Sequence, residues 1–436
     1  MALSELSVAI FLQISVILGT CQVVGWIMKR LFSQPHVIGE MIAGVILGPS
    51  LLGLISPNFQ NMVFPTETKP VLYVCAQLGI GLYMFSVGLG FRIHDFRLSA
   101  KSAFAVSLAG MTAPFLFSIV LTPWLLSHNL FGKNVTSFQA TLFLGACISV
   151  TAFPVLARII QERGLNQTPL GTLALSAGAI DDVCAWAVLA IVLASFGGGT
   201  DIALKAIVGG GLFAAFMIFL GPKLMAPLAQ RAEREGKVTP SILAISIILF
   251  GLSAWTMDAA GLHSVFGGFL LGVAMPRGLL SLEIKKQVEP FTAVLLLPIF
   301  FTFSGLNTQL TVVDSLNLTV ITAVVLVGSI ASKGMACWAA ARATGQDSNT
   351  AMAVGALMNA RGMMELIMIN IGLQKGIIGA PLFSVLVVMA IVTTLMTTPL
   401  FERVYGRKAR ALGKIGRPDE SSIDDCAERF PSKTQA

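Results

Sequence analysis

The chain has 436 residues, of which 55% are hydrophobic and only 12% are charged, and its formal net charge is +7. Soluble domains carry about 25% charged residues, so this composition excludes an ordinary soluble protein and indicates a membrane protein with several spans. The positive excess follows from where the basic residues lie between the spans, so it calls for no nucleic-acid partner.

Thirteen apolar segments are long enough to cross a bilayer as helices, which takes about 20 residues each. They extend over residues 6–28, 37–54, 70–91, 102–126, 137–160, 168–195, 203–226, 240–257, 261–276, 289–307, 315–341, 349–373 and 379–401. The first segment lacks a small-residue cleavage site, so we interpret it as a retained helix and not as a signal peptide. We therefore expect an all-α membrane domain over residues 1–402 and a polar, disordered tail over 403–436.

Lys and Arg residues gather in alternate connections between these segments, and basic connections usually stay in the cytoplasm. Lys29 and Arg30 follow the first segment, and the polar tail is basic as well. The opposite connections hold only Lys69, Lys133, Lys205 and Lys375. We therefore expect the N-terminus outside and the C-terminus in the cytoplasm, in a bacterial-type inner membrane.

The two halves of the chain share short motifs in the same order. The matched segments are 37–45 with 265–273, 85–89 with 303–306, Ala152 with Ala360, and Gly164-Leu165 with Gly372-Leu373. Each matched pair is seven segments apart, so the two copies would cross the membrane in opposite directions. This pattern predicts two inverted repeats, over about 6–195 and 240–402, with the segment 203–226 as connector.

The fifth and twelfth segments are both interrupted near their middles. Pro154 in the fifth lacks a backbone donor and clashes with the preceding turn, and Gly362 in the twelfth permits an unwound backbone. Corresponding breaks in two halves point to a binding site near the membrane midplane. Unwinding frees carbonyl groups for a cation and exposes partial charges at the half-helix ends. A kink that serves only packing is the alternative.

Two adjacent carboxylates, Asp181 and Asp182, lie deep inside the apolar segment 168–195. An ionised side chain at mid-membrane costs about 2.5–3.5 kcal/mol on insertion scales, and such residues usually mark an ion or proton pathway. Neighbouring helix residues point about 100° apart, so each carboxylate needs its own partner. Burial favours the protonated carboxyl group whereas a bound cation favours the ionised one, so protons and a cation would compete for one group.

Four ordered motifs carry a family resemblance. They are His36-Val37-Ile38-Gly39-Glu40 to Gly48-Pro49-Ser50, Thr151–Arg158, Asp182–Trp186 and Asn359–Leu366. Together they resemble the monovalent cation:proton antiporter-2 family, nearest to bacterial relatives of plant cation/proton exchangers, over residues 6–401. The resemblance implies the sodium/proton antiporter fold with crossed discontinuous helices, a homodimer and no cofactor.

The resemblance also implies roles for individual residues. Asp182 matches the family's ion-binding carboxylate, and the Thr151 hydroxyl could join it because Na⁺ and K⁺ prefer oxygen ligands. Asp181 resembles a companion acid that pairs with a lysine of the eleventh segment, where Lys333 stands. This pair either carries a proton or is a fixed strut. Plant relatives have Asn at the position of Asp181, whereas the double acid resembles electrogenic sodium/proton antiporters.

Further polar residues are candidates for supporting roles, and Glu40 is a second-rank one. Arg361 and Glu365 are four residues apart on one helix and can pair, so we expect them, with Asn359, to compensate charge at the break. Glu40 in the second segment either lines a cytoplasmic funnel or supports its helix.

From these observations we expect a secondary antiporter, not an enzyme, that exchanges Na⁺, or else K⁺ or Li⁺, for protons by alternating access and with net charge movement. No phosphate-binding Gly-Lys-Ser/Thr loop is present, so no nucleotide is implied. Three alternatives stay open: a sodium-coupled symporter for organic anions, a gated K⁺ efflux system, and a membrane sensor that transports nothing.

Overall fold

The computed structural model describes residues 3–32, 34, 36–91, 93–165, 168–193, 195, 200–260, 264–307, 316–407 and 409. In these ranges the regular structure is helical, and one isolated bridge joins Phe131 to Ile378. The predicted all-α class is confirmed. Most of the predicted polar tail lies outside the described residues.

The helices of the first half are α1 (Leu3–Phe32), α2 (His36–Leu47), α3 (Leu52–Ile55), α4 (Pro57–Val63), the 3₁₀ turn η1 (Thr66–Thr68), α5 (Lys69–Gly90), α6 (Ile93–Ser127), α7 (Ser137–Ser149), α8 (Phe153–Glu162) and α9 (Pro169–Leu193). Two of these starts follow from local sequence. Thr136 and Gln139 form a capping box before α7, which is worth about 1 kcal/mol, and Pro154 stands in the first turn of α8, where proline is tolerated.

The remaining helices are α10 (Thr200–Phe219), α11 (Gly221–Glu235), α12 (Pro240–Ala259), α13 (Ser264–Ala274), α14 (Leu279–Phe291), the π-helical turn η3 (Thr292–Leu296), α15 (Leu297–Leu306), α16 (Leu316–Ala343), α17 (Ser348–Leu357), α18 (Met363–Gln374), α19 (Ala380–Phe401) and the π-helical turn η4 (Glu402–Gly406). Asp347 caps α17 by accepting hydrogen bonds from the backbone N–H groups of Asn349 and Thr350.

Helix occupies part of every one of the thirteen predicted segments. Within the described residues, however, nine helical stretches are long and apolar enough to cross a membrane, or ten if the bent pair α10 and α11 forms one span. Interruptions shorten several of the other helices, and α13 has only 11 residues. The thirteen crossings therefore stay a prediction.

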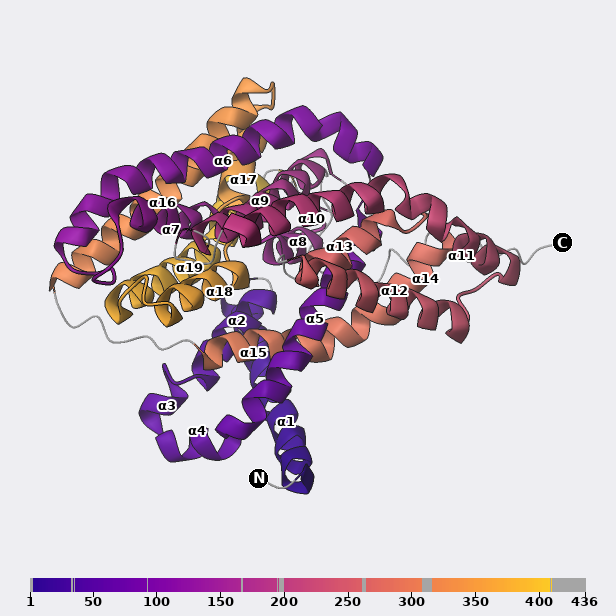
Figure 1. The fold of residues 1–436 in the computed structure, drawn as a ribbon, viewed down its shortest axis with the longest axis horizontal. Coiled ribbons are helices and arrows are strands. Elements are labelled where there is room, and N and C mark those ends of the chain that lie inside the picture. The colour runs from indigo at the N-terminus through magenta and orange to yellow at the C-terminus, as the bar shows by residue number, and fades with distance from the viewer. Residues whose placement is uncertain are drawn as a thin grey trace.

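The helices pack in two groups that Figure 1 shows side by side. The first, which we call the α6 group, contains α6, α7, α9, α16, α17, α18 and α19. The second, the α5 group, contains α1, α2, α5, α12, α13, α14 and α15. Helix α8 contacts members of both groups, and α15 contacts α18. These contacts are where one group could move against the other.

Two close helix contacts in the α5 group use glycines from the matched sequence motifs. Gly44 of α2 lies against Gly305 of α15, and Gly272 of α13 lies against Gly88 of α5. A Cβ atom at any of the four would overlap the backbone of the facing helix, so glycine permits the approach. In the predicted repeat α2 corresponds to α13 and α5 corresponds to α15, so one contact corresponds to the other. The contacts agree with the repeat, which stays a prediction.

Large apolar side chains cover the outside of several long helices. Phe11 on α1 is 71% exposed, Val120 on α6 is 77% exposed and Trp255 on α12 is 69% exposed. Exposed large apolar side chains on long apolar helices fit a protein with several membrane-spanning helices.

Candidate functional site

The interruption between α7 and α8 faces the interruption between α17 and α18. The Ala152 N–H donates a hydrogen bond to the Ala360 carbonyl over 3.0 Å. The Thr151 hydroxyl oxygen lies 3.1 Å from the Met358 carbonyl oxygen. The two breaks expected from the sequence are therefore present, and a backbone hydrogen bond joins them.

Two basic side chains cap the C-terminal end of α7. The Arg361 guanidinium donates to the carbonyls of Cys147, over 2.8 Å, and Ile148, over 2.6 Å. The Lys333 ammonium donates to the Ser149 carbonyl. The last carbonyls of a helix lack intrahelical partners and carry partial negative charge. Arg361 thus stands at one break and donates hydrogen bonds to carbonyls at the other.

Both oxygen atoms of the Asp181 carboxylate accept hydrogen bonds. Its Oδ2 accepts from the Lys333 ammonium over 3.0 Å and from the Thr151 hydroxyl over 2.7 Å. Its Oδ1 accepts from the Ser107 hydroxyl over 2.5 Å. Asp181 and Lys333 are both fully buried. The structure brings this predicted pair together at the centre of the α6 group.

Asp182 stands beside Asp181 on α9 but has a different environment. Its side chain is 2% exposed, and its Oδ1 accepts no hydrogen bond within the part of the chain that the structure describes. Thr151, which the sequence analysis placed beside Asp182 as a ligand, donates its single hydroxyl proton to Asp181, over 2.7 Å. Asp182 is a buried carboxylate with an open acceptor atom.

Arg361 and Glu365 form the expected pair along α18, with Nη1 and Oε1 3.3 Å apart and both side chains fully buried. Thr394 of α19 exchanges hydrogen bonds with the Arg361 backbone and fixes its position. Asn359 donates from Nδ2 to the Gly355 carbonyl, and its Oδ1 accepts no bond in the described residues. Arg361, Glu365 and Asn359 therefore all lie at the break, as the sequence predicted.

Glu40 lies in a separate cluster. Its Oε1 is 3.0 Å from Nδ1 of His36 on the same helix, and its side chain is buried. None of the hydrogen bonds described above for Asp181 or Asp182 involves Glu40. The structure therefore does not bring Glu40 to the paired carboxylates.

The sequence analysis missed Ser107 and Thr394. Both are hydroxyl residues inside apolar helices, where such side chains commonly bond to their own helix. Nothing local distinguishes them from the other serines and threonines of these helices. The carbonyls of Cys147, Ile148 and Ser149 were also missed as individual partners, although the predicted break implied free carbonyls there.

The donor atoms at the breaks are oxygens and not the thiolates or imidazoles that bind transition metals. No cluster of three or more His, Cys, Asp or Glu side chains with metal-binding geometry occurs among the described residues. The available groups are carboxylate, hydroxyl and carbonyl oxygens, which are the ligands of hard cations.

Comparison with known proteins extends this picture. Residues 17–403 match the family model described as sodium/hydrogen exchanger, transmembrane. The chain is 40% identical over 404 residues to the Na⁺/H⁺ antiporter NhaS4 of Synechocystis sp., an alignment that covers 91% of this chain and 97% of that protein.

Two further comparisons concern a plant relative and a solved structure. Cation/H⁺ antiporter 18 of Arabidopsis thaliana is 33% identical over 420 residues, which are 95% of this chain but 51% of the plant protein, so the chain spans about half of that relative. The electron-microscopy structure of the sodium proton antiporter MjNhaP1 from Methanocaldococcus jannaschii matches with a TM-score of 0.65, over 99% of this chain and 100% of that one. At 14% sequence identity this likeness shows a common fold.

The contacts of Arg361 predict a large effect on stability. We expect Arg361→Gln to lower the free energy of unfolding by about 3–5 kcal/mol, because it leaves the Glu365 carboxylate buried without its counter-charge. Thermal unfolding of the purified protein in detergent would measure this loss. The double variant Arg361→Gln/Glu365→Gln removes both charges and should recover part of it. A double variant as unstable as the sum of the two single variants would contradict the pairing.

Proposed function

The chain belongs to the sodium/hydrogen exchanger family, and from this premise we propose that it is a secondary antiporter that exchanges a monovalent cation for protons. Membership confirms the resemblance that the sequence motifs indicate. It also supports a transporter rather than an enzyme. The relatives compared above are named antiporters, so we do not favour a symporter, a gated K⁺ efflux system or a sensor.

The single observation that carries this proposal is the open oxygen atom of Asp182 inside the α6 group. An uncompensated carboxylate at such a place costs several kcal/mol, so Asp182 is stable only when it holds a proton or a cation. The two occupants exclude each other. If the site opens to each side of the membrane in turn, exclusive occupancy makes the exchange obligatory.

We propose Na⁺ as the transported cation, with K⁺ and Li⁺ as the alternatives. The name of the Synechocystis relative supports Na⁺. The ligands available to the cation are Asp182 Oδ1, the Thr151 hydroxyl oxygen and carbonyl groups at the breaks. Ligand number and spacing at this site would decide among the three cations.

We further propose that exchange moves net charge. Lys333 is buried against Asp181 and the end of α7, so it could release its proton when a cation binds nearby and take it back when the cation leaves. Together with Asp182, that would exchange two protons for one monovalent cation. The pair Asp181 and Lys333 would then carry a proton and not serve only as a strut.

Hydrogen bonds close the end of the molecule that we predict to face the cytoplasm. Glu162, the last residue of α8, accepts from the His36 N–H at the start of α2 over 2.7 Å and from Arg158 over 2.8 Å. Gln161 donates to Glu289 of α14 over 2.7 Å. These contacts, which we call the α8 latch, tie α8 to two helices of the α5 group.

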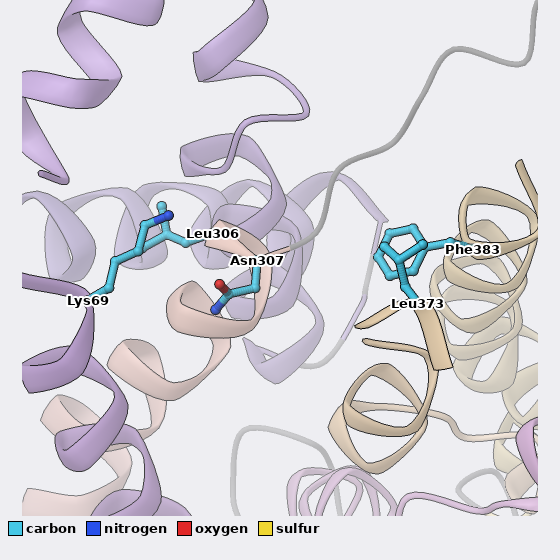
Figure 2. A pocket seen from close by; sticks show the side chains of 5 residues that line it. All are labelled: Lys69, Leu306, Asn307, Leu373 and Phe383. Carbon is cyan, nitrogen blue, oxygen red and sulfur yellow. The ribbon is translucent and has the colours of Figure 1, made fainter. Parts of the chain in front are cut away.

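A small open pocket lies between the two groups at the opposite end. It has a volume of about 160 Å³ and is lined by Lys69, Leu306, Asn307, Leu373 and Phe383. Figure 2 shows Lys69, Leu306 and Asn307, from α5 and α15, on one side and Leu373 and Phe383, from α18 and α19, on the other. We propose alternating access in which this conformation is closed at the α8 latch and the α6 group moves against the α5 group.

We also propose a homodimer in a bacterial-type inner membrane, with the N-terminus outside. The placement of Lys and Arg supports the orientation, and the exposed apolar faces of α1 and α12 offer surface for a second copy. Labelling of cysteines placed near each terminus, and the mass of the protein in detergent, would test the two statements. Labelling of both termini from the same side, or a monomer mass, would contradict them.

The central prediction concerns Asp182→Asn. In liposomes that hold purified protein and a pH-sensitive dye, we expect Na⁺ to drive proton movement in the wild type, and we expect proton movement in Asp182→Asn at the level of empty liposomes. The amide cannot bind or release a proton. Asp258→Asn, on the exposed face of α12, is the matched control and should transport normally. No flux with Na⁺, K⁺ or Li⁺ in the wild type would overturn the antiporter.

The same liposomes test charge movement. With the membrane potential left free, electrogenic exchange should slow as charge accumulates, and clamping the potential with valinomycin and K⁺ should restore the rate. An equal rate under both conditions would rule out the proposed two-to-one exchange while leaving antiport itself standing.

The α8 latch predicts a local change in Glu162→Ala, which removes both acceptor oxygens. Loss of hydrogen bonds to a charged group, each worth about 1.5–3 kcal/mol, should raise amide hydrogen exchange in the first turn of α2 about tenfold or more. Hydrogen–deuterium exchange measured by mass spectrometry would detect it. Glu283→Ala removes an exposed ion pair with Lys286 and is the control. Protection of α2 equal to that of the wild type would show that the latch does not hold this end.

A further inference from the structure

Ser107 uses its hydroxyl differently from other hydroxyl residues of α6. Thr112 donates to the Leu108 carbonyl one turn earlier, and Ser118 donates to the Phe115 and Thr141 carbonyls. Ser107 instead donates to Oδ1 of Asp181, 74 positions away in the chain. Its side chain is 1% exposed. A Ser hydroxyl inside a helix commonly donates its hydrogen bond to a backbone carbonyl of the same helix. The bond from Ser107 to Asp181 on α9 therefore requires an explanation.

The packing of α6 on α16 explains how Ser107 reaches the site. A Cβ atom at Gly110, one turn after Ser107, would lie 2.6 Å from the Cys337 sulfur and 3.9 Å from Cε of Lys333. The Cys337 sulfur in turn lies 3.7 Å from the Val106 carbonyl oxygen. Glycine therefore lets α6 approach α16 where Lys333 is located, and Ser107 and Lys333 converge on one carboxylate.

The groups around Asp181 suit a carboxylate. Ser107 donates to Oδ1, and Thr151 and Lys333 donate to Oδ2. A carboxylate only accepts, so it can take hydrogen bonds from all three groups at once. A protonated Asp181 would donate from one oxygen, and a hydroxyl such as that of Ser107 would have to turn and accept instead. Among the described residues, Ser107 is the donor to Oδ1 of Asp181.

We propose that Ser107 is a positioning residue of the exchanger, which holds Asp181 as a carboxylate with both oxygens occupied and so leaves Asp182 as the carboxylate that the transported cation binds. This inference rests on the proposed antiport. Ser107 itself touches neither Asp182 nor, on this account, the cation. Its effect passes through Asp181 to Lys333.

The consequence of losing Ser107 follows from the same contacts. When Lys333 releases its proton, Ser107 and Thr151 are the donors that keep the Asp181 charge satisfied. Without Ser107, Oδ1 is left bare in a buried site, so Lys333 retains its proton more often. An ammonium retained on Lys333 stays paired with Asp181, the neighbour of Asp182 in the sequence, and its positive charge disfavours binding of the transported cation. The expected result is weaker apparent binding of the cation with a smaller change in the maximal rate.

The test is cation-driven proton flux in liposomes, measured over a range of Na⁺ concentrations. Ser107→Ala should raise the apparent KM for Na⁺ about tenfold, the effect of losing a hydrogen bond to a charged group, and should lower the maximal rate less than about threefold. Ser107→Thr keeps the hydroxyl and should restore the KM. Ser118→Ala removes another buried hydroxyl of α6 that donates to backbone carbonyls, and it should behave as the wild type.

The outcomes separate the inference from the function on which it rests. Transport by the wild type with an unchanged KM in Ser107→Ala overturns the role of Ser107 and leaves antiport intact. A lower maximal rate at unchanged KM, or a loss that Ser107→Thr does not restore, indicates a structural role and also overturns it. If the wild type moves no protons with any monovalent cation, the proposed function fails and this inference fails with it. Thermal unfolding of each variant shows whether it is folded when assayed.

Discussion

A charge buried inside a membrane protein has to be matched by an opposite charge within hydrogen-bonding reach, and this constraint orders the site. Among the residues that the structure describes around the two breaks, Lys333 pairs with Asp181 and Arg361 pairs with Glu365. Both basic side chains also cap the carbonyls of α7. Asp182 is the acid left over. The break between α7 and α8 and the excess carboxylate are thus parts of one electrostatic arrangement, which a proton or a small cation would complete under the proposed function.

The short helix α8 connects this arrangement to the boundary between the two helix groups. It begins beside the break, where Ala152 bonds to Ala360, and ends at the α8 latch, where Glu162 bonds to His36. Its ten residues span about 15 Å, because a helix rises 1.5 Å per residue. In the proposed alternating access, a shift of α8 at the site would displace the latch. This connection gives the proposed alternating access a physical path.

Much of this site could be predicted from the sequence, because its parts are rare in apolar helices. Asp182, Lys333 and Arg361 stand out as charges in segments that otherwise exclude them, and Pro154 and Gly362 mark the breaks. The ion pair of Arg361 with Glu365 follows from helical spacing. Ser107 could not be found in this way, because one hydroxyl among many in an apolar helix carries no local signal.

The remaining differences have equally plain causes. Asp181 and Asp182 point about 100° apart on α9. Which of them meets the Thr151 hydroxyl depends on how α9 is rotated against the segment between α7 and α8, and sequence spacing does not determine that rotation. The number of membrane crossings depends on where interrupted and short helices such as α13 and α17 lie, and hydropathy treats each apolar run as one span. The sequence leaves two roles open for the Glu40 side chain. In the structure its partner is His36, four residues away on the same helix.

The central claim is that a proton and a cation compete for Asp182, and proton release on cation binding tests it most directly. Purified protein in weakly buffered detergent solution, with a pH-sensitive dye, would receive sodium chloride, with choline chloride as the control for ionic strength. The account predicts that sodium releases protons from the wild-type protein and none from Asp182→Asn. Equal release from both proteins, or sodium binding to the wild type without proton release, would contradict it.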